Sequence, residues 1–72
     1  MKNGEIIKTC ELWDIVNSEQ KSGEAIATEG TAVKLFDEIR IHGEVEFQKI
    51  QVKIEGTEKI QWIAKANLTL LE

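Results

Sequence analysis

The sequence predicts a mainly β protein, with an α+β arrangement as the alternative. We expect a small antiparallel curled sheet or barrel of four to five strands, with at most one short helix near 31–37. Residues 59–70 alternate between apolar and polar side chains, the period-two pattern of a strand with one buried face. A second alternating segment precedes it, and 5 glycines divide the chain into short pieces, as turns do.

Length and composition indicate one small domain over 1–72. Apolar residues make up 42% of the 72 residues, which is enough for one core, and the formal net charge is −4. This balance argues against a disordered chain and makes nucleic acid an unexpected partner, since nucleic-acid binders usually carry a basic face. No apolar run approaches the roughly 20 residues of a membrane helix, so no membrane partner is expected.

Cysteine content and size suggest where the protein works and whether it self-associates. Cys10 is alone, and small secreted domains usually carry disulfides, so we expect the cytoplasm of a bacterial or phage-infected cell. No signal-peptide pattern opens the chain. A core of this size rarely supplies more than about 3–5 kcal/mol, so a well-packed β core or homo-oligomerisation is needed.

The N-terminal half is predicted to contain a hairpin. Apolar segments 11–16 and 24–28 flank the polar segment 17–23, which reads as strand, loop and strand. The alternative is a helix over 9–22, capped by Thr9.

The segment between Gly30 and Gly43 is ambiguous. A helix capped by Thr31 would place several apolar residues on one face. The β-branched residues that follow the acidic pair at 37–38 favour a strand instead. We therefore predict a short helix or turn near 31–37 that runs into a strand over 38–42.

The next segment, 45–54, reads as a strand whose apolar phase changes. Ile50 and Val52 alternate with polar residues, but Val45 and Phe47 lie in the opposite phase. A β-bulge near 48–49 would restore the phase. The alternative is that Val45 and Phe47 face a different neighbour.

This strand is predicted to form a hairpin with 59–70 around a turn at 55–58. A two-residue turn would set apolar side chains opposite polar ones along the pair. We therefore predict a loop of three or five residues, with Val52 opposite Ile60 or Trp62 and the shorter loop favoured. The predicted buried face of the last strand carries Ile60, Trp62, Ala64, Ala66, Leu68 and Leu70.

Four residues are candidates for contact with a partner: Trp13, Arg40, His42 and Ile63. Ile63 is the apolar residue on the polar face of the last strand. Trp13 is out of phase with Leu12, which fits an interface anchor or the rim of the core. Arg40 and His42 share one strand face, where Arg40 suits an anion or a partner contact, or else pairs with a nearby glutamate.

Catalytic chemistry is not predicted. Cys10, the single His42 and scattered carboxylates do not provide the three or four ligands of a metal site. Cys10 lies in a strand-like segment, where a buried inert thiol is common. We therefore expect no enzyme, no cofactor and no metal.

The sequence predicts a small non-enzymatic protein-binding module that contacts another protein, itself as a homo-oligomer, or both. One alternative is a phage-encoded inhibitor that blocks a host protein or sequesters a small anionic ligand. A second is a weak single-stranded nucleic-acid-binding β-barrel, which the few aromatic residues and the acidic balance disfavour.

Overall fold

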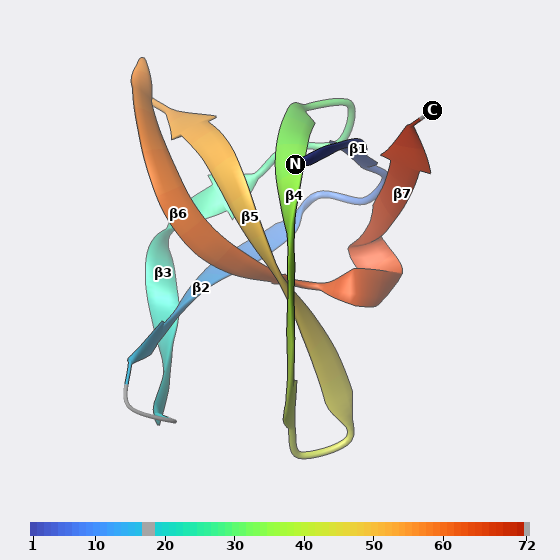
Figure 1. Ribbon diagram of the computed structural model, residues 1–72. Helices are drawn as coiled ribbons and strands as arrows, with labels where there is room; N and C mark the ends of the chain where they lie inside the picture. Colours follow the sequence, from blue (N-terminus) through green and yellow to red (C-terminus); the bar gives the residue numbers. More distant parts are fainter. Residues whose placement is uncertain (17–18, 72) are drawn as a thin grey trace.

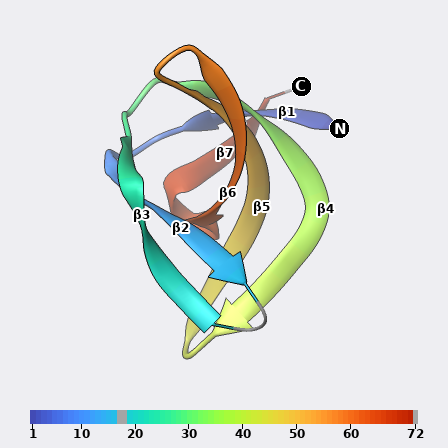
Figure 2. The ribbon, with the colours of Figure 1, turned by 90° about the vertical axis from the view of Figure 1, so that its left-hand side faces the viewer.

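The computed structural model describes the backbone of residues 1–16 and 19–71, and the side chains of residues 1–13 and 26–71. Its elements are β1 (Lys2–Ile6), β2 (Cys10–Val16), β3 (Glu19–Ala27), β4 (Ala32–His42), β5 (Val45–Ile54), β6 (Thr57–Ala64), the 3-10 turn η1 (Lys65–Asn67) and β7 (Leu68–Leu71). The strands form one sheet in the order β3-β2-β6-β5-β4-β1-β7. Figures 1 and 2 show this sheet curling around a common interior as a half-barrel.

The predicted mainly β fold with a curled antiparallel sheet is confirmed. The sheet has seven strands rather than four or five, because two short strands extend it beyond β4: β1 pairs with β4, and β7 pairs with β1. Across the described residues, η1 is the one helical element, and nothing helical there is long and apolar enough to cross a membrane.

The predicted hairpin in the N-terminal half is confirmed, and the alternative helix over 9–22 is wrong. β2 and β3 pair antiparallel, from Cys10 opposite Ala27 to Val16 opposite Glu19. The strand resumes at Glu19, so the predicted loop over 17–23 is too long. Residues 17–18 lie outside the described residues.

The helix or turn expected at 31–37 is wrong, because β4 is continuous and carries a bulge. Phe36, Asp37 and Glu38 stand opposite a single residue, Lys49, between two regular stretches of the β4–β5 ladder. The buried Gln48 amide donates hydrogen bonds to the Phe36 carbonyl and, at 3.2 Å, to the Glu38 carbonyl. The bulge adds two residues to β4, so Leu35 before it and Ile39 after it both lie on the inner face, opposite Ile50 and Gln48. The Gln48 amide provides hydrogen bonds where the ladder is interrupted.

The hairpin of β5 and β6 forms as predicted, but its register does not. Ile54 pairs with Thr57 and Val52 pairs with Lys59, around the two-residue loop Glu55-Gly56. Both loop residues have positive φ, 50° at Glu55 and 82° at Gly56, and such turns match the right-handed twist of paired strands. The turn geometry therefore sets this register, with apolar residues opposite polar ones.

The Glu55→Asn substitution tests this turn. Glu55 adopts a left-handed conformation, which costs a side chain with an ordinary Cβ about 1–2 kcal/mol and is easier for asparagine. We expect Glu55→Asn to raise the free energy of unfolding by a few tenths to about 1 kcal/mol. Urea denaturation measures it, and an unchanged or lower stability would contradict the turn assignment.

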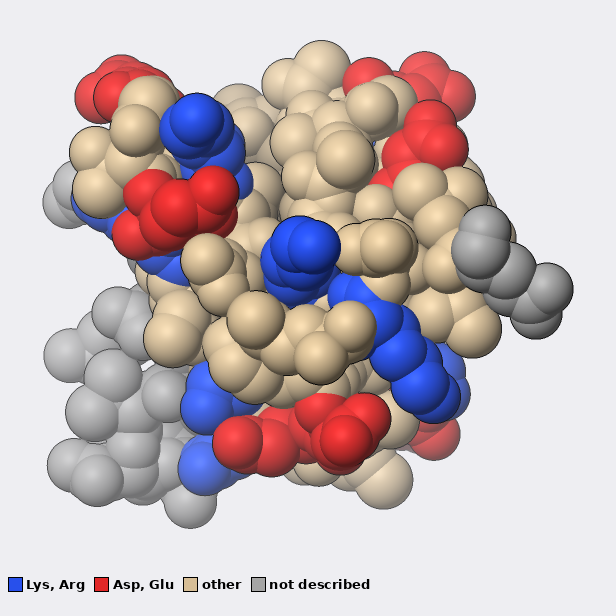
Figure 3. All heavy atoms as spheres, turned by 45° about the horizontal axis from the view of Figure 1, so that its top comes forward, with Lys and Arg blue, Asp and Glu red and all other residues tan. Residues whose placement is uncertain are grey.

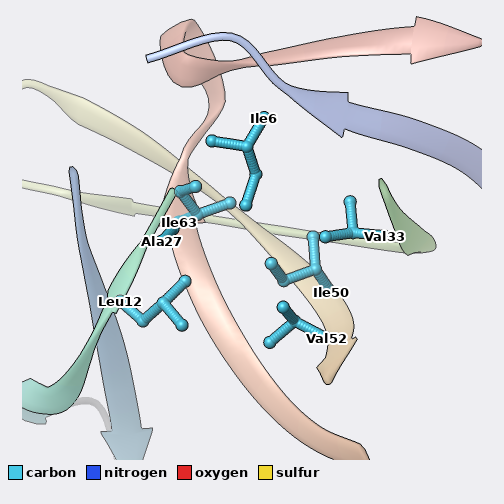
Figure 4. Packing of buried hydrophobic residues seen from close by; sticks show 7 residues of the cluster. All are labelled: Ile6, Leu12, Ala27, Val33, Ile50, Val52 and Ile63. Carbon is cyan, nitrogen blue, oxygen red and sulfur yellow. The ribbon is translucent and has the colours of Figure 1, made fainter. Parts of the chain in front are cut away.

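The core lies on the inner face of the curl, with side chains from six strands. Figure 4 shows its buried cluster of Ile6, Leu12, Ala27, Val33, Ile50, Val52 and Ile63. Burying such aliphatic side chains contributes about 1.5–3 kcal/mol for each large residue. Ile63, expected on the polar face, is 0% exposed, so that expectation is wrong.

The apolar phase of β5 changes because Phe47 lies on the outer face, and not because of a bulge in β5. The β5–β6 ladder is continuous from Phe47 opposite Ala64 to Ile54 opposite Thr57, so the expected bulge at 48–49 is wrong. The alternative is confirmed for Phe47, which points to the outer face and packs against Trp13 rather than into the core.

The last predicted strand is broken and only partly buried on its expected face. η1 interrupts 59–70 after Ala64, and β7 then pairs with β1. Trp62 is 5% exposed, as expected, but Ile60 is 53% and Leu70 50% exposed. The two-residue turn places Trp62 and Ile60 on the outer face, where other side chains cover Trp62 but leave Ile60 exposed.

Candidate functional site

Aromatic side chains gather on the outer face of the sheet, opposite the aliphatic core. Residues directly opposite each other on neighbouring strands share a face. Trp13 of β2 stands opposite Trp62 of β6, and Arg40 of β4 stands opposite Phe47 of β5. We call these four residues, Trp13, Arg40, Phe47 and Trp62, the outer-face patch.

Two rings of the patch are buried, and each contacts a more accessible side chain: Phe47 contacts Trp13, and Trp62 contacts Arg40. The Trp13 and Phe47 rings meet edge to face, with centroids 6.1 Å apart and an interplanar angle of 73°. The Arg40 Cζ atom lies 5.4 Å from the centroid of the Trp62 ring, a cation–π contact. Phe47 and Trp62 are buried beneath Arg40, which is exposed, and Trp13, which is half-buried.

Cationic side chains continue beside the patch. Lys49 stands opposite Trp62, with its Nζ atom 5.3 Å from the Phe36 ring centroid and 3.1 Å from a Glu38 carboxylate oxygen. Within the described part of the chain, the ion pairs are this one and that between Lys65 and Glu46, and neither includes Arg40. The expected ion pair between Arg40 and a glutamate is therefore replaced by the contact of Arg40 with the Trp62 ring.

Two exposed aliphatic side chains flank the patch on the same face. Ile60 lies two residues before Trp62, at the neighbouring outward position of β6, and is 53% exposed. Ile26 of β3 stands opposite Glu11, on the Trp13 side of β2, and is 68% exposed. Such a grouping of apolar side chains with polar neighbours is typical of a contact surface.

The predicted contact residues divide into three groups. The structure brings Trp13 and Arg40 together in one patch. His42 lies on the same face of β4, at the next outward position after Arg40, and is exposed. Ile63 is fully buried in the core and offers no surface to a partner. Phe47 was not predicted as part of this surface, although the phase change in β5 signalled its outward position.

A shallow cavity of about 460 Å³ lies between the β4–β5 turn and η1. It is lined by Glu44, Val45, Glu46, Lys65 and Ala66, and Lys65 Nζ lies 3.7 Å from a Glu46 carboxylate oxygen. Across the described residues, no three His, Cys, Asp or Glu side chains are grouped closely enough to hold a metal ion.

Cys10 is half-buried at the rim of the core. Burial raises the pKa of the Cys10 thiol, while a hydrogen bond with the Asn67 side chain and the charge of Lys8 oppose that rise. A raised pKa reduces the fraction of thiolate, the reactive form, at neutral pH.

We therefore expect Cys10 to react with an aromatic disulfide reagent more slowly in the folded chain than in the urea-unfolded chain at neutral pH. The raised pKa also contributes stability that is fully present below the unfolded-state pKa and is lost as pH rises through the folded-state pKa. Reaction rates of the folded and of the urea-unfolded chain, followed by absorbance at increasing pH, report the thiolate fraction of Cys10 in each state. Equal rates at every pH would contradict the burial of this thiol.

Comparison of the chain with protein-family models, curated proteins and solved structures finds no match. Function is therefore inferred from the geometry of this chain alone.

Proposed function

We propose that this chain is a small non-enzymatic protein-binding module that contacts its partner through the outer-face patch. The observation that carries the proposal is the placement of Arg40 and Trp13 above the buried Trp62 and Phe47 rings. Tryptophan and arginine are enriched at the residues that dominate binding energy in protein interfaces. Exposed Ile60 and Ile26 extend this surface on either side.

The way the patch is built favours tight binding. Its residues stand on paired strands of the sheet rather than on loops, and the contacts with Phe47 and Trp62 hold Trp13 and Arg40 in place. Side chains already ordered in the free protein lose less conformational entropy on binding, which leaves more of the contact energy as affinity.

The same geometry gives less support to single-stranded nucleic acid as the partner. Binding of bases by stacking needs aromatic ring faces open to solvent. Phe47 and Trp62 are each 5% exposed, and Arg40 lies over the Trp62 ring.

The test compares two exposed positions of equal chemistry. Ile60→Asp places a charge beside the patch, whereas Ile41→Asp does so on the other face of the sheet, where Ile41 is 71% exposed. Partner protein captured by the wild-type chain and identified would be titrated against both variants by calorimetry. We expect Ile60→Asp to abolish binding and Ile41→Asp to preserve it. Equal binding by wild type and Ile60→Asp would contradict the proposal.

Self-association is favoured by a separate feature, the edge strand β7. β7 stands at one end of the strand order, and its four residues, Leu68–Leu71, include no charged side chain. Edge strands that stay monomeric usually carry lysine, proline or a bulge that prevents pairing with another chain. We propose that this edge pairs with a second copy of the chain.

Light scattering tests this pairing with Leu70→Lys, a change at a position that is 50% exposed. We expect the wild-type mass to exceed the 8.2 kDa of one chain at high concentration, and the variant to return to it. A wild-type mass of one chain at millimolar concentration would contradict the pairing.

A further inference from the structure

Cations outnumber carboxylates on the outer face around β4 and β5, where four cations stand beside Glu38 and Glu58, although the chain as a whole is acidic. Ladder pairing places Lys34 opposite Gln51, Arg40 opposite Phe47, Lys49 opposite Trp62 and Lys53 opposite Glu58, all on this face. We call Lys34, Arg40, Lys49 and Lys53 the basic strip. The chain carries a net charge of −4, so the strip is a local reversal of its overall sign.

Figure 3 gives an oblique view in which the top of Figure 1 comes forward. Basic and acidic side chains lie side by side at several places on the visible face, with uncharged surface between these groups. Alternation along β5 separates the strip from the core, because outward Lys49, Gln51 and Lys53 alternate with inward Ile50 and Val52.

Within the strip, Arg40 is the side chain best prepared to bind an anion. Its guanidinium is held over the Trp62 ring by a cation–π contact, and the residue is exposed. A guanidinium presents several N–H donors in a planar fork that matches the two oxygens of a carboxylate. Lys49, by contrast, is already engaged by Glu38 at 3.1 Å.

We propose that the partner contributes an extended acidic segment that lies along the basic strip, with one carboxylate bound by Arg40. This inference rests on the proposed function, because it specifies what occupies the outer-face patch. An extended chain presents side chains on one side at intervals of about 6.5–7 Å, so carboxylates at alternate positions follow the spacing of outward residues on a strand.

The test is a tryptophan fluorescence titration with two ten-residue probe peptides. One alternates glutamate and leucine, and the other has glutamine in place of each glutamate. We expect the glutamate peptide to bind about 10- to 100-fold more tightly, since a hydrogen bond to a charged group contributes about 1.5–3 kcal/mol. The preference should weaken as salt is added, because exposed charges are screened.

Three variants locate the effect. We expect Arg40→Ala to lose most of the preference for glutamate, and Arg40→Lys to retain part of it, since lysine keeps the charge but not the planar fork. Lys59→Ala is the matched control. Lys59 is an exposed cation that stands opposite Val52 on the inner face of β6, so its loss should change the affinity less than about 2-fold. Thermal unfolding of each variant confirms that it remains folded.

Two results would overturn the inference. One is equal affinity for the two peptides, or an unchanged preference in Arg40→Ala. The other is binding of a single-stranded oligothymidylate through Arg40 with no binding of the glutamate peptide, which would make nucleic acid the occupant. If acidic selectivity fails while Ile60→Asp still abolishes partner binding, the inference alone is wrong. If Ile60→Asp also has no effect, the proposed function fails with it.

Discussion

Replacement of Trp62 by alanine is expected to lower the free energy of unfolding by about 3–5 kcal/mol, enough to unfold much of a domain this small. Trp62 is 5% exposed on the outer face of β6, where Trp13 stands opposite it and Arg40 covers its ring. Removal of the indole leaves a cavity and takes away the surface on which Arg40 rests. Urea denaturation followed by circular dichroism measures the loss.

Ile60→Ala is the control for that experiment. Ile60 lies two residues away on the same face of the same strand, but it is 53% exposed. Its truncation should change stability by about 0.5 kcal/mol or less. Equal losses in Trp62→Ala and Ile60→Ala would show that the outer face has no buried aromatic layer.

Replacement of Ile63 by alanine is expected to cost about 2–5 kcal/mol. Ile63 is the next residue along β6, but it points the other way, into the inner core, and is 0% exposed. The surrounding aliphatic side chains, including Ile6 and Ile50, can fill only part of the space it leaves. The loss is measured by the same denaturation experiment.

Ile41→Ala provides the comparison for the inner face, because Ile41 lies beyond the core on the β4–β5 hairpin and is 71% exposed. We expect little change there. A wild-type stability for Ile63→Ala would mean that β6 is shifted by one residue, with Ile63 outward as its sequence pattern suggested.

The fold class and the pairing of strands adjacent in the chain were predictable from the sequence, because both depend on residues close together in the chain. Alternation in 45–54 and 59–64, and turn residues between them, were sufficient to predict the β5–β6 hairpin. The placement of Arg40 and His42 on one face of β4 followed from the same alternation. The strand β1 was missed, since Lys2–Ile6 has little apolar pattern and pairs with residues far away in the chain, and β7 was predicted only as the end of one strand over 59–70.

The assignment of faces failed for one physical reason. An alternating pattern predicts a strand with one buried side, but β6 buries both sides where consecutive Trp62 and Ile63 pack against different layers. The two-residue turn at Glu55-Gly56 then set a register that the apolar pattern argued against. The cation–π contact of Arg40 could not be predicted either, because it depends on β5 lying between β4 and β6.

The central claim is that the outer-face patch is the binding surface, and nitrogen–proton NMR of the labelled chain tests it most directly. The chain contains 2 tryptophans, so it gives two indole N–H resonances, from Trp13 and Trp62. On addition of the captured partner protein, we expect both to shift together with the Arg40 side-chain resonance, while the backbone amides of Leu68–Leu71 stay in place. Shifts confined to Leu68–Leu71, with both indole resonances unchanged, would contradict the claim.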